Sequence, residues 1–285
     1  MLPVGVLGLE SDMVSILVAI FCFLIGGASI ALLWFMGTFK ETDAREVPSL
    51  VQQFSMRTVL VVLAHPDDEI FITGFLSDIV SRQDCRVVVI TASQGRGGDS
   101  FGKKEKGKGL AEQRRFEMAA HFAQLRVNEF TVLDFADGGI DKQEEELTTV
   151  LASWVIKVQP DTVLTFDPGS GYTGHPDHMA VGRAVVAAVQ RNNGAEERLE
   201  KKVKNLVYFL VPRRAMNLFG GVRGKIVARN QVEVQFAVNI NPALKIRGWK
   251  THVSQSSYLW KVYSIPPWLL YRFFRQEFFS VQKEL

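Results

Sequence analysis

Two short segments of the chain hold most of the residues that could do metal or acid–base chemistry. Residues 64–69 read A-H-P-D-D-E and follow the apolar run T-V-L-V-V-L, and residues 171–178 read G-Y-T-G-H-P-D-H. The chain has five histidines, and three of them, His65, His175 and His178, lie in these two segments. Imidazoles and carboxylates are the ligands of catalytic zinc sites and also act as general acids and bases. The two segments are therefore candidates for one active site.

A metal-ligand set can be drawn from the two segments together. His65 and Asp68 follow one apolar run, and His178 lies in the first turn of a helix that Pro176 is suited to begin. Two imidazoles and one carboxylate leave a coordination position for water, as in catalytic zinc centres, and other divalent metals accept the same ligands. Read separately, each segment is often only a polar helix cap. Together they favour a metal site.

Two further groups in these segments are suited to catalysis. Asp67 is adjacent to the expected ligand Asp68 and is placed to take a proton from water at the metal. His175 is suited to stabilise the oxyanion of a tetrahedral intermediate or to protonate a leaving amine. Glu69 opens the next expected helix, where a carboxylate meets the positive helix end, so we expect a structural role for it.

The elements that must position these residues alternate between strand and helix. Apolar, β-branched runs predict strands at 58–64, 86–92, 129–134, 162–166 and 206–211, and amphipathic patterns predict helices at 70–81, 110–125, 142–158 and 176–190. This alternation predicts an α/β fold, a Rossmann-like three-layer domain with a mainly parallel sheet covered by helices on both faces. In such sheets, ligands bind beyond the carboxyl ends of the strands, and both segments follow a strand.

A long apolar segment lies near the N-terminus, with no charged residue between Asp12 and Lys40. As a helix it is long enough to cross the ~30 Å hydrocarbon core of a membrane. The run has no basic residue before it and is too long for a signal peptide, which favours a retained anchor. We therefore expect an N-terminal tail at 1–12, a transmembrane helix at 13–39, a linker at 40–56 and a catalytic domain at 57–285.

The charges that flank the apolar segment predict its orientation. Glu10 and Asp12 precede it, whereas Lys40 and Arg45 follow it. By the positive-inside rule, this difference places the C-terminal domain in the cytoplasm. The expected location is therefore a single-pass membrane protein, in the endoplasmic reticulum of a eukaryote or the plasma membrane of a bacterium.

Composition excludes several classes of function. A hydrophobic content of 47% and a charged content of 22% are those of a folded protein, and a net charge of +3 is too small to indicate nucleic-acid binding. The chain has neither a G-x-G-x-x-G nor a Walker-type loop, so we expect no nucleotide cofactor. Cys22 and Cys85 lie in segments of different kinds, which argues against a disulfide framework.

The two segments resemble the signature of the LmbE-like, or PIG-L, de-N-acetylases. The resemblance covers residues 57 to about 280 and includes weaker matches, which read T-A-S-Q-G at 91–95, R-R-F-E-M-A-A at 114–120, D-F-A-D-G-G at 134–139 and H-V-S-Q at 252–255. It implies a Zn²⁺ on His65, Asp68 and His178. It also implies that Asp67 is the general base and that His175 is its acid or electrostatic partner.

The resemblance carries further implications for the substrate. It implies that Arg114 and Asp137 contact the polar head or sugar hydroxyls of an amino-sugar conjugate. Some members have a catalytic tyrosine two residues before the first histidine of H-P-D-H; that position is Thr173 here, and Tyr172 is next to it. The implied reaction is removal of acetyl from an N-acetylglucosamine-type sugar, either soluble or lipid-linked, as in the N-acetylglucosaminyl-phosphatidylinositol of GPI biosynthesis.

Two alternative functions remain open at this point. A metal-dependent phosphoesterase or other hydrolase would use the same ligands, and a membrane-anchored binding protein would retain the fold without catalysis. Two segments also have two interpretations each. Residues 94–109, rich in glycine and lysine, suit a lid over an anionic substrate or a solvated loop. Residues 265–279, rich in aromatic residues, suit a helix on a membrane surface or a segment docked on the domain's core.

Overall fold

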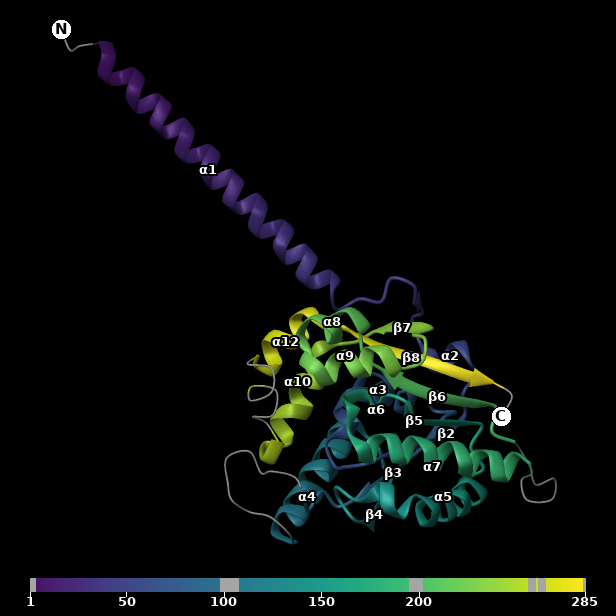
Figure 1. The fold of residues 1–285 in the computed structure, drawn as a ribbon. Helices are drawn as coiled ribbons and strands as arrows, with labels where there is room; N and C mark the ends of the chain where they lie inside the picture. Colours follow the sequence, from purple (N-terminus) through teal and green to yellow (C-terminus); the bar gives the residue numbers. More distant parts are fainter. Residues whose placement is uncertain (1–3, 98–107, 195–201, 256–259, 261–264, 284–285) are drawn as a thin grey trace.

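The computed structural model shows an α/β domain from which one long helix projects (Figure 1). It describes residues 4–97, 108–194, 202–255, 260 and 265–283. The expected lid segment falls mainly on residues 98–107, which lie outside the described residues.

The sheet has eight strands in the order β1-β7-β8-β6-β5-β2-β3-β4. Its parallel part contains the five predicted strands, which are β2 (Thr58–Leu63), β3 (Arg86–Ser93), β4 (Glu129–Phe135), β5 (Thr162–Phe166) and β6 (Asn205–Leu210). The strands β2 and β5 are almost entirely buried, as expected for parallel strands covered on both faces. The prediction of a mainly parallel α/β sheet is confirmed.

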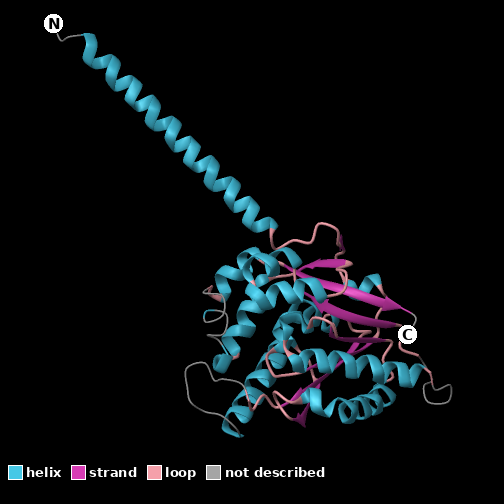
Figure 2. Ribbon diagram, in the orientation of Figure 1, coloured by secondary structure: helices cyan, strands magenta, loops and turns pink. Residues whose placement is uncertain are grey.

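Helices cover both faces of the sheet (Figure 2). The helices α3 (Thr73–Val80) and α4 (Lys108–Leu125) lie in the crossovers from β2 to β3 and from β3 to β4, and α10 (Pro242–Thr251) packs on both. The helices α5 (Glu144–Val158) and α7 (Pro176–Asn193) pack on each other along the other face. They lie in the crossovers from β4 to β5 and from β5 to β6, which run along the sheet in the opposite direction to the first two. Because all these crossovers are right-handed, the change of direction places α5 and α7 on the opposite face. Short 3₁₀ turns, η1 (Asp68–Ile72) and η2 (Ile140–Gln143), precede α3 and α5.

The strands β2 and β5 are neighbours, with Val59 paired to Thr162 and Val61 paired to Leu164. From β2 the chain proceeds outward through β3 and β4, and then returns to β5 and β6 on the other side of β2. The strand order therefore reverses between β2 and β5. A crevice at such a reversal is where ligands bind in doubly wound sheets.

The second half of the chain adds elements that the sequence did not predict. The strand β8 (Gln276–Lys283) runs antiparallel between β6 and β7 (Phe236–Asn239). The helices α8 (Arg213–Phe219), α9 (Gly221–Asn230) and α12 (Pro267–Phe273) and the turn η3 (Val253–Gln255) complete this part. Of the two interpretations of residues 265–279, docking on the domain is right for the strand portion, because Phe278 and Phe279 are buried in the sheet.

Residues 40–56, which we expected to be a linker, are part of the domain instead. The edge strand β1 (Arg45–Glu46) pairs with β7, and the helix α2 (Leu50–Gln53) begins at a cap in which Ser49 accepts a hydrogen bond from the Gln52 N–H. Leu50, Val51 and Met56 are buried, so their apolar side chains hold this segment on the core.

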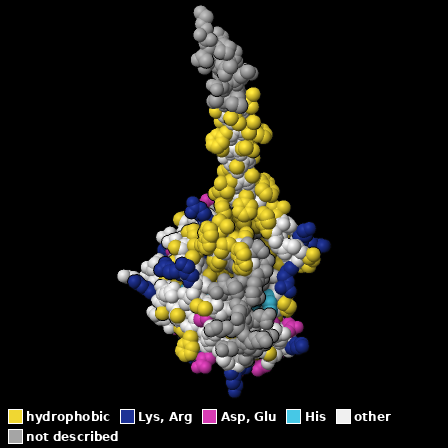
Figure 3. Space-filling model, turned by 90° about the vertical axis from the view of Figure 1, so that its left-hand side faces the viewer, with side chains coloured by type: hydrophobic (Ala, Val, Ile, Leu, Met, Phe, Trp, Pro, Cys, Tyr) yellow, Lys and Arg dark blue, Asp and Glu magenta, His cyan; other side chains and the backbone are white. Residues whose placement is uncertain are grey.

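The long helix α1 (Val4–Gly37) includes most of the expected N-terminal tail as well as the apolar segment. By length and composition, the stretch Ile16–Gly37 of this helix could cross a membrane. Its residues from Ile16 to Trp34 are exposed. Its C-terminal end packs on the domain, where Phe35 contacts Phe219 and Phe273 at 5.6 and 5.1 Å between ring centroids. Figure 3 shows that the apolar surface of α1 continues onto the domain at this point.

A buried ion pair ties the C-terminal strand to the segment that follows Asp68. The carboxylate of Glu277 on β8 accepts hydrogen bonds from the N–H groups of Gly74 and Phe75, each 2.9 Å long, and lies 3.0 Å from Nζ of Lys245. Lys245 also donates to the carbonyl of Phe71. The position of α3, and with it the turn that carries Asp68, therefore depends on β8 and α10.

We expect Glu277→Ala to lower the free energy of unfolding by about 3–5 kcal/mol, because Lys245 would remain buried without its anion. The measurement is chemical denaturation of the full chain in mild detergent, followed by circular dichroism. Glu129→Ala is the control, since Glu129 pairs with Arg86 at an exposed position where the loss is about 1 kcal/mol or less. Equal losses in the two variants would contradict this account.

Candidate metal centre and active site

The structure brings His65, Asp68 and His178 together at the carboxyl ends of β2 and β5. Nδ1 of His65 lies 3.2 Å from Nε2 of His178, and Nε2 of His178 lies 3.3 Å from Oδ1 of Asp68. The remaining separation, from Nδ1 of His65 to Oδ2 of Asp68, is 3.7 Å. All three side chains are buried, and their donor atoms form a group that could hold one metal ion.

These separations fit tetrahedral coordination of one divalent ion. Ligand atoms about 2.0–2.2 Å from zinc lie roughly 3.3–3.6 Å from one another in a tetrahedron. The two separations that share Nε2 of His178, 3.2 Å to His65 and 3.3 Å to Oδ1 of Asp68, are close to this spacing. A fourth position would remain for water or substrate, which is typical of a catalytic rather than a structural site.

Hydrogen bonds on the far side of each imidazole turn the correct nitrogen toward the centre. Nδ1 of His178 lies 2.9 Å from the carbonyl of Gly171, which only accepts, so Nδ1 carries the proton and Nε2 is free to ligate. Nε2 of His65 lies 3.1 Å from both Asp137 and Asp177, so its proton is on Nε2 and Nδ1 is free. Partners of this kind orient metal-ligating histidines in known sites.

Negative charge is concentrated around the centre. Burial lowers the pKa of His65, but its hydrogen bonds with Asp137 and Asp177 and the charge of Asp68 raise it to about 10 overall. Burial acts against ionisation of Asp137, yet its bonds with His65 and the Gly97 N–H hold its pKa well below the usual range. Three carboxylates that remain ionised around two imidazoles form a site suited to a cation.

Asp67 has a backbone conformation that only a tightly held residue adopts. Its φ of 110° lies in the left-handed region, which costs an ordinary side chain on the order of 1–3 kcal/mol. Two contacts hold it there: its N–H donates to Glu69 over 2.9 Å, and its carboxylate lies 3.1 Å from the guanidinium of Arg114. Burial raises the pKa of Asp67 to about 6, against the lowering effect of Arg114. A carboxylate with this pKa is suited to act as a general base near neutral pH.

Arg114 is buried, and its described contacts are with the loops that carry the site. It donates to the carbonyls of Gly95 and Pro66 over 3.1 and 2.7 Å, in addition to its ion pair with Asp67. A Cβ at position 95 would meet the guanidinium at 2.6 Å, so Gly95, with φ +70°, is required for this approach. Arg114 thus positions the base, and its contact with substrate stays a prediction.

Asp137, which we expected to contact substrate, also has partners among the protein's own groups in the site. It contacts Nε2 of His65 and accepts a 2.7 Å hydrogen bond from the N–H of Gly97. Asp177, which we did not select from the sequence, has the same function: it contacts His65 and accepts from the N–H groups of Gly138 and Ile140. The signal was present, because Asp177 is the third residue of the H-P-D-H motif.

His175 lies beside the two histidine ligands, with its ring centroid 5.0 Å from each of theirs. It caps α7, since its Nδ1 accepts a 3.2 Å hydrogen bond from the N–H of Asp177. Burial, together with repulsion by His178 and His65, lowers its pKa to about 4. His175 is therefore neutral near pH 7 and carries its proton on Nε2, where it can donate to a substrate oxygen.

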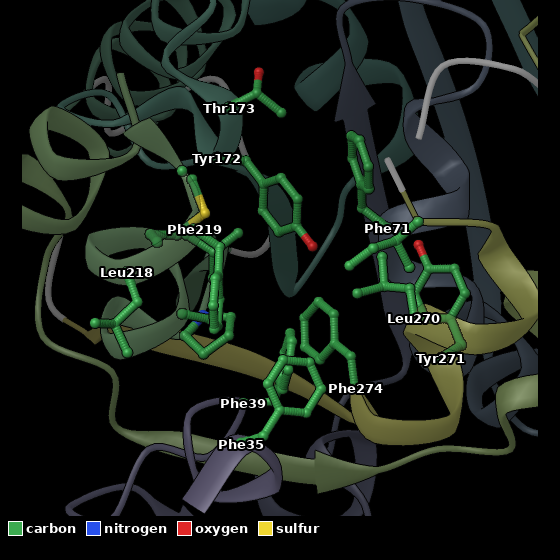
Figure 4. A pocket seen from close by; sticks show the side chains of 16 residues that line it. Phe35, Phe39, Phe71, Tyr172, Thr173, Leu218, Phe219, Leu270, Tyr271 and Phe274 are labelled. Carbon is green, nitrogen blue, oxygen red and sulfur yellow. The ribbon is translucent and has the colours of Figure 1, made fainter. Parts of the chain in front are cut away.

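The positions before His175 do not bring a tyrosine to the metal side. Thr173 lies 3.2 Å from Nδ1 of His178. Tyr172, also in the left-handed region at φ 63°, instead stacks on Phe71 with 4.4 Å between ring centroids. The tyrosine side chain faces a separate apolar pocket, which Figure 4 shows.

A second buried cluster supports the strained turn at Asp67. Oε1 of Glu69 lies 2.9 Å from Nδ1 of His121 and 2.5 Å from Nε2 of His252, while Oε2 accepts from the Asp67 N–H. All three members of the cluster are buried, and their side chains form a second group that could hold a metal ion. A structural role for Glu69 stays a prediction, and its partners His121 and His252 were not predicted. In the sequence, His252 was indicated only by the weak H-V-S-Q match at 252–255.

The doubly wound sheet and the site at its strand reversal define an α/β protein with a buried group of two histidines and one aspartate that could hold a metal ion. The PIG-L family, described as GlcNAc-PI de-N-acetylase, matches residues 60–189, which include every expected site residue. This part of the chain is thus similar to the PIG-L family, as the two motifs led us to expect.

Individual proteins are similar to part of the chain. The 1D-myo-inositol 2-acetamido-2-deoxy-alpha-D-glucopyranoside deacetylase of Kineococcus radiotolerans is 31% identical over 179 residues, which are 53% of this chain. The chain spans only about half, 49%, of that relative's length.

Solved structures share the fold. The N,N'-diacetylchitobiose deacetylase of Pyrococcus horikoshii matches with a TM-score of 0.60 and 20% identity, over 82% of this chain and 86% of that one. The 4-carboxy-2-hydroxymuconate hydratase of Pseudomonas putida matches with a TM-score of 0.58 and 18% identity, over 81% and 98%. Because these two proteins are named for different reactions, the fold alone does not determine the activity.

We expect Asp68→Ala to lower the metal content of the purified chain, because it removes one of three ligands. Asp67→Asn should retain the metal, since its carboxylate contacts Arg114 instead. Elemental analysis after dialysis measures both, with the exposed Asp141→Asn as control. Loss of metal in Asp67→Asn but not in Asp68→Ala would show that the two carboxylates have the opposite roles.

The acidic limb of the pH profile of kcat/KM should report the ionisation of Asp67 in the free enzyme. Its pKa is raised to about 6 by burial, and activity is lost as the pH falls through that pKa, so we expect the limb at about pH 6, or lower when a cation is bound. Arg114→Met removes a positive charge and should move the limb to higher pH. Arg115→Met, at the neighbouring exposed position, should leave it in place. A limb that does not move in Arg114→Met would contradict the assignment.

Proposed function

We propose that the protein removes the N-acetyl group from an N-acetylglucosamine-type amino sugar with the help of a divalent metal, zinc in the first instance. The observation that carries this proposal is the group of His65, Asp68 and His178, whose donor atoms lie 3.2 to 3.7 Å apart beside Asp67. The PIG-L match and the deacetylase relative support this reaction and this class of substrate.

The residues of the chain would share the reaction in a defined way. When bound, the cation supplies a Lewis acid that polarises the amide carbonyl and acidifies water. Asp67 accepts the proton of the attacking water and returns it to the amine nitrogen as the C–N bond of the tetrahedral intermediate breaks. His175 donates its Nε2 proton as a hydrogen bond to the oxygen that becomes negative in the tetrahedral intermediate. Arg114 and the Glu69 cluster hold Asp67 in its strained conformation, and Arg114 is in addition expected to contact the substrate.

Acetate release is the experiment that tests this function. The metal-loaded chain should release acetate from N-acetylglucosaminides, and Asp67→Asn should lose roughly 10²- to 10⁴-fold in kcat while it keeps its metal. His175→Ala should lose roughly 10²- to 10³-fold, mainly in kcat, because a neutral donor acts on the transition state. Phosphate release from matched phosphate esters without acetate release would instead identify a phosphoesterase.

We also propose that α1 anchors the enzyme in a membrane, with the domain on the cytoplasmic side. The exposed apolar stretch from Ile16 supports this, as does the position of Lys40 and Arg45 after it. The full chain should therefore stay in the membrane fraction after high-salt and alkaline washing. Recovery of a soluble chain that starts beyond residue 40 would identify a cleaved leader.

A further inference from the structure

The helices α8 and α9 present exposed apolar side chains next to the end of α1. Leu218 and Phe219 at the end of α8 are 48% and 46% exposed, and Val222 and Ile226 on α9 are 80% and 53% exposed. We call these four residues the α8–α9 face. Figure 3 shows hydrophobic side chains gathered at the base of α1. A soluble monomer seldom leaves such a cluster in water, so this face is a candidate interaction surface.

The charged side chains of the same two helices are all basic. Residues 213–230 contain no Asp or Glu. Arg213 donates to the carbonyls of Gln231 and Val232, and the other four basic side chains are exposed: Arg214, Arg223, Lys225 and Arg229. Four positive charges exceed the net charge of the whole chain, +3, so the rest of the chain carries no net positive charge. Apolar side chains bordered by basic ones are typical of helices that lie on a membrane surface with anionic lipids.

Contacts between α8 and α1 place this face at the level where a bilayer would end. The candidate span Ile16–Gly37 has 22 residues, about 33 Å as a helix, which is close to the ~30 Å hydrocarbon core. The ring of Phe219 lies 5.6 Å from that of Phe35, and the guanidinium of Arg214 lies 5.7 Å from the ring of Trp34. Trp34 and Phe35 are near the end of the span. A bilayer that holds α1 therefore has its headgroups beside Phe219 and Arg214.

We propose that the α8–α9 face is a second membrane contact, which inserts its apolar side chains among the lipid headgroups and pairs its basic neighbours with anionic lipids. The proposal goes beyond the deacetylase function and rests on α1 as the anchor. Two observations select a bilayer over a protein partner: the contact of α8 with the candidate span, and the exclusively basic charge of α8 and α9. A bilayer that holds α1 necessarily meets this face, whereas a protein would have to displace it.

This contact would orient the active site relative to the bilayer. The helix α9 packs on the turn from Gly171 to Gly174. A Cβ at position 174 would meet Cγ of Arg223 and Cγ2 of Val227, each at 3.1 Å, so the glycine permits a close approach. Gly174 directly precedes His175. The face and the active site therefore belong to one packed unit, and docking of the face would prevent rotation of the domain about the end of α1.

Quenching by lipid-borne nitroxides tests the contact in the full chain. Cys22→Ser and Cys85→Ser remove the native thiols, and an NBD fluorophore is attached to one new cysteine at a time in nanodiscs that contain phosphatidylserine. Headgroup nitroxides should quench the label of Val222→Cys. Phe116→Cys is the matched control, because Phe116 is 68% exposed on α4, which Figure 1 shows on the far side of the domain from α1. Acyl-chain nitroxides should quench Leu24→Cys, which reports the anchor.

Neutralising variants test the contribution of lipid charge. Fluorescence lifetimes of the Val222→Cys label give the ratio of docked to undocked domain. Lys225→Gln and Arg229→Gln should each lower this ratio roughly fivefold in phosphatidylserine, the effect of one basic side chain near an anionic surface. High salt should lower it in wild type, because it screens these charges. Arg115→Gln and Lys142→Gln, at exposed positions on α4 and η2, should leave the ratio unchanged.

Each failure has its own signature. Quenching at Leu24 but not at Val222 would overturn the proposal and leave the anchor, whereas no quenching at Leu24 would refute both. A docked ratio that is the same in phosphatidylcholine and phosphatidylserine, or in the α9 and control variants, would also overturn the proposal. A Val222 label that is shielded only as the chain concentration rises, without lipid quenching, would identify a second copy of the chain instead. Acetate release enters none of these measurements, so failure of the deacetylase function is scored separately.

Discussion

The structure depends on one constraint: two imidazole nitrogens and a carboxylate must stay within 3.2 to 3.7 Å of one another in a buried position. The two ring nitrogens that face one another cannot both present lone pairs, so either a proton lies between them, which the raised pKa of His65 favours, or a cation takes its place. The strand reversal brings the two loops together, and Asp137, Asp177 and the Gly171 carbonyl keep the ring protons on the outer side. The adjacent positions of β2 and β5 are thus a requirement of the site.

The site also explains why the domain extends beyond the segment that matches the family. Asp67 holds a strained conformation through Glu69, and Glu69 is held by His121 and by His252, which lies well beyond residue 189. Glu277 fixes the start of α3 in a similar way. The C-terminal elements therefore do not merely extend the sheet. They supply the rigid support that keeps Asp67, the proposed general base, in a conformation it would otherwise leave.

The parts of the fold that the sequence predicted well are those with a strong local signal. The five β-branched runs lie at their expected positions, and A-H-P-D-D-E and H-P-D-H meet because their strands are neighbours. The edge strand β1 and the short helix α2 were missed, since a polar stretch with one proline is typical of a linker until β7 is available to pair with it. Arg114 and Asp137 were assigned to substrate by resemblance, whereas their contacts with Asp67 and His65 depend on loops that no local pattern specifies.

The turn from Gly171 to Gly174 connects the group of His65, Asp68 and His178 with the apolar pocket. One side of it holds Nδ1 of His178 through the Gly171 carbonyl and Thr173, and on the other side Tyr172 faces the apolar pocket. Tyr172 adopts its unusual φ of 63° between these two contacts, stacked on Phe71. Because Phe35 and Phe39 form the far end of the same pocket, α1 contributes side chains to this arrangement as well as apolar length. Another helix of equal hydrophobicity would not rebuild that wall, so the last turn of α1 belongs to the architecture that surrounds His65, Asp68 and His178.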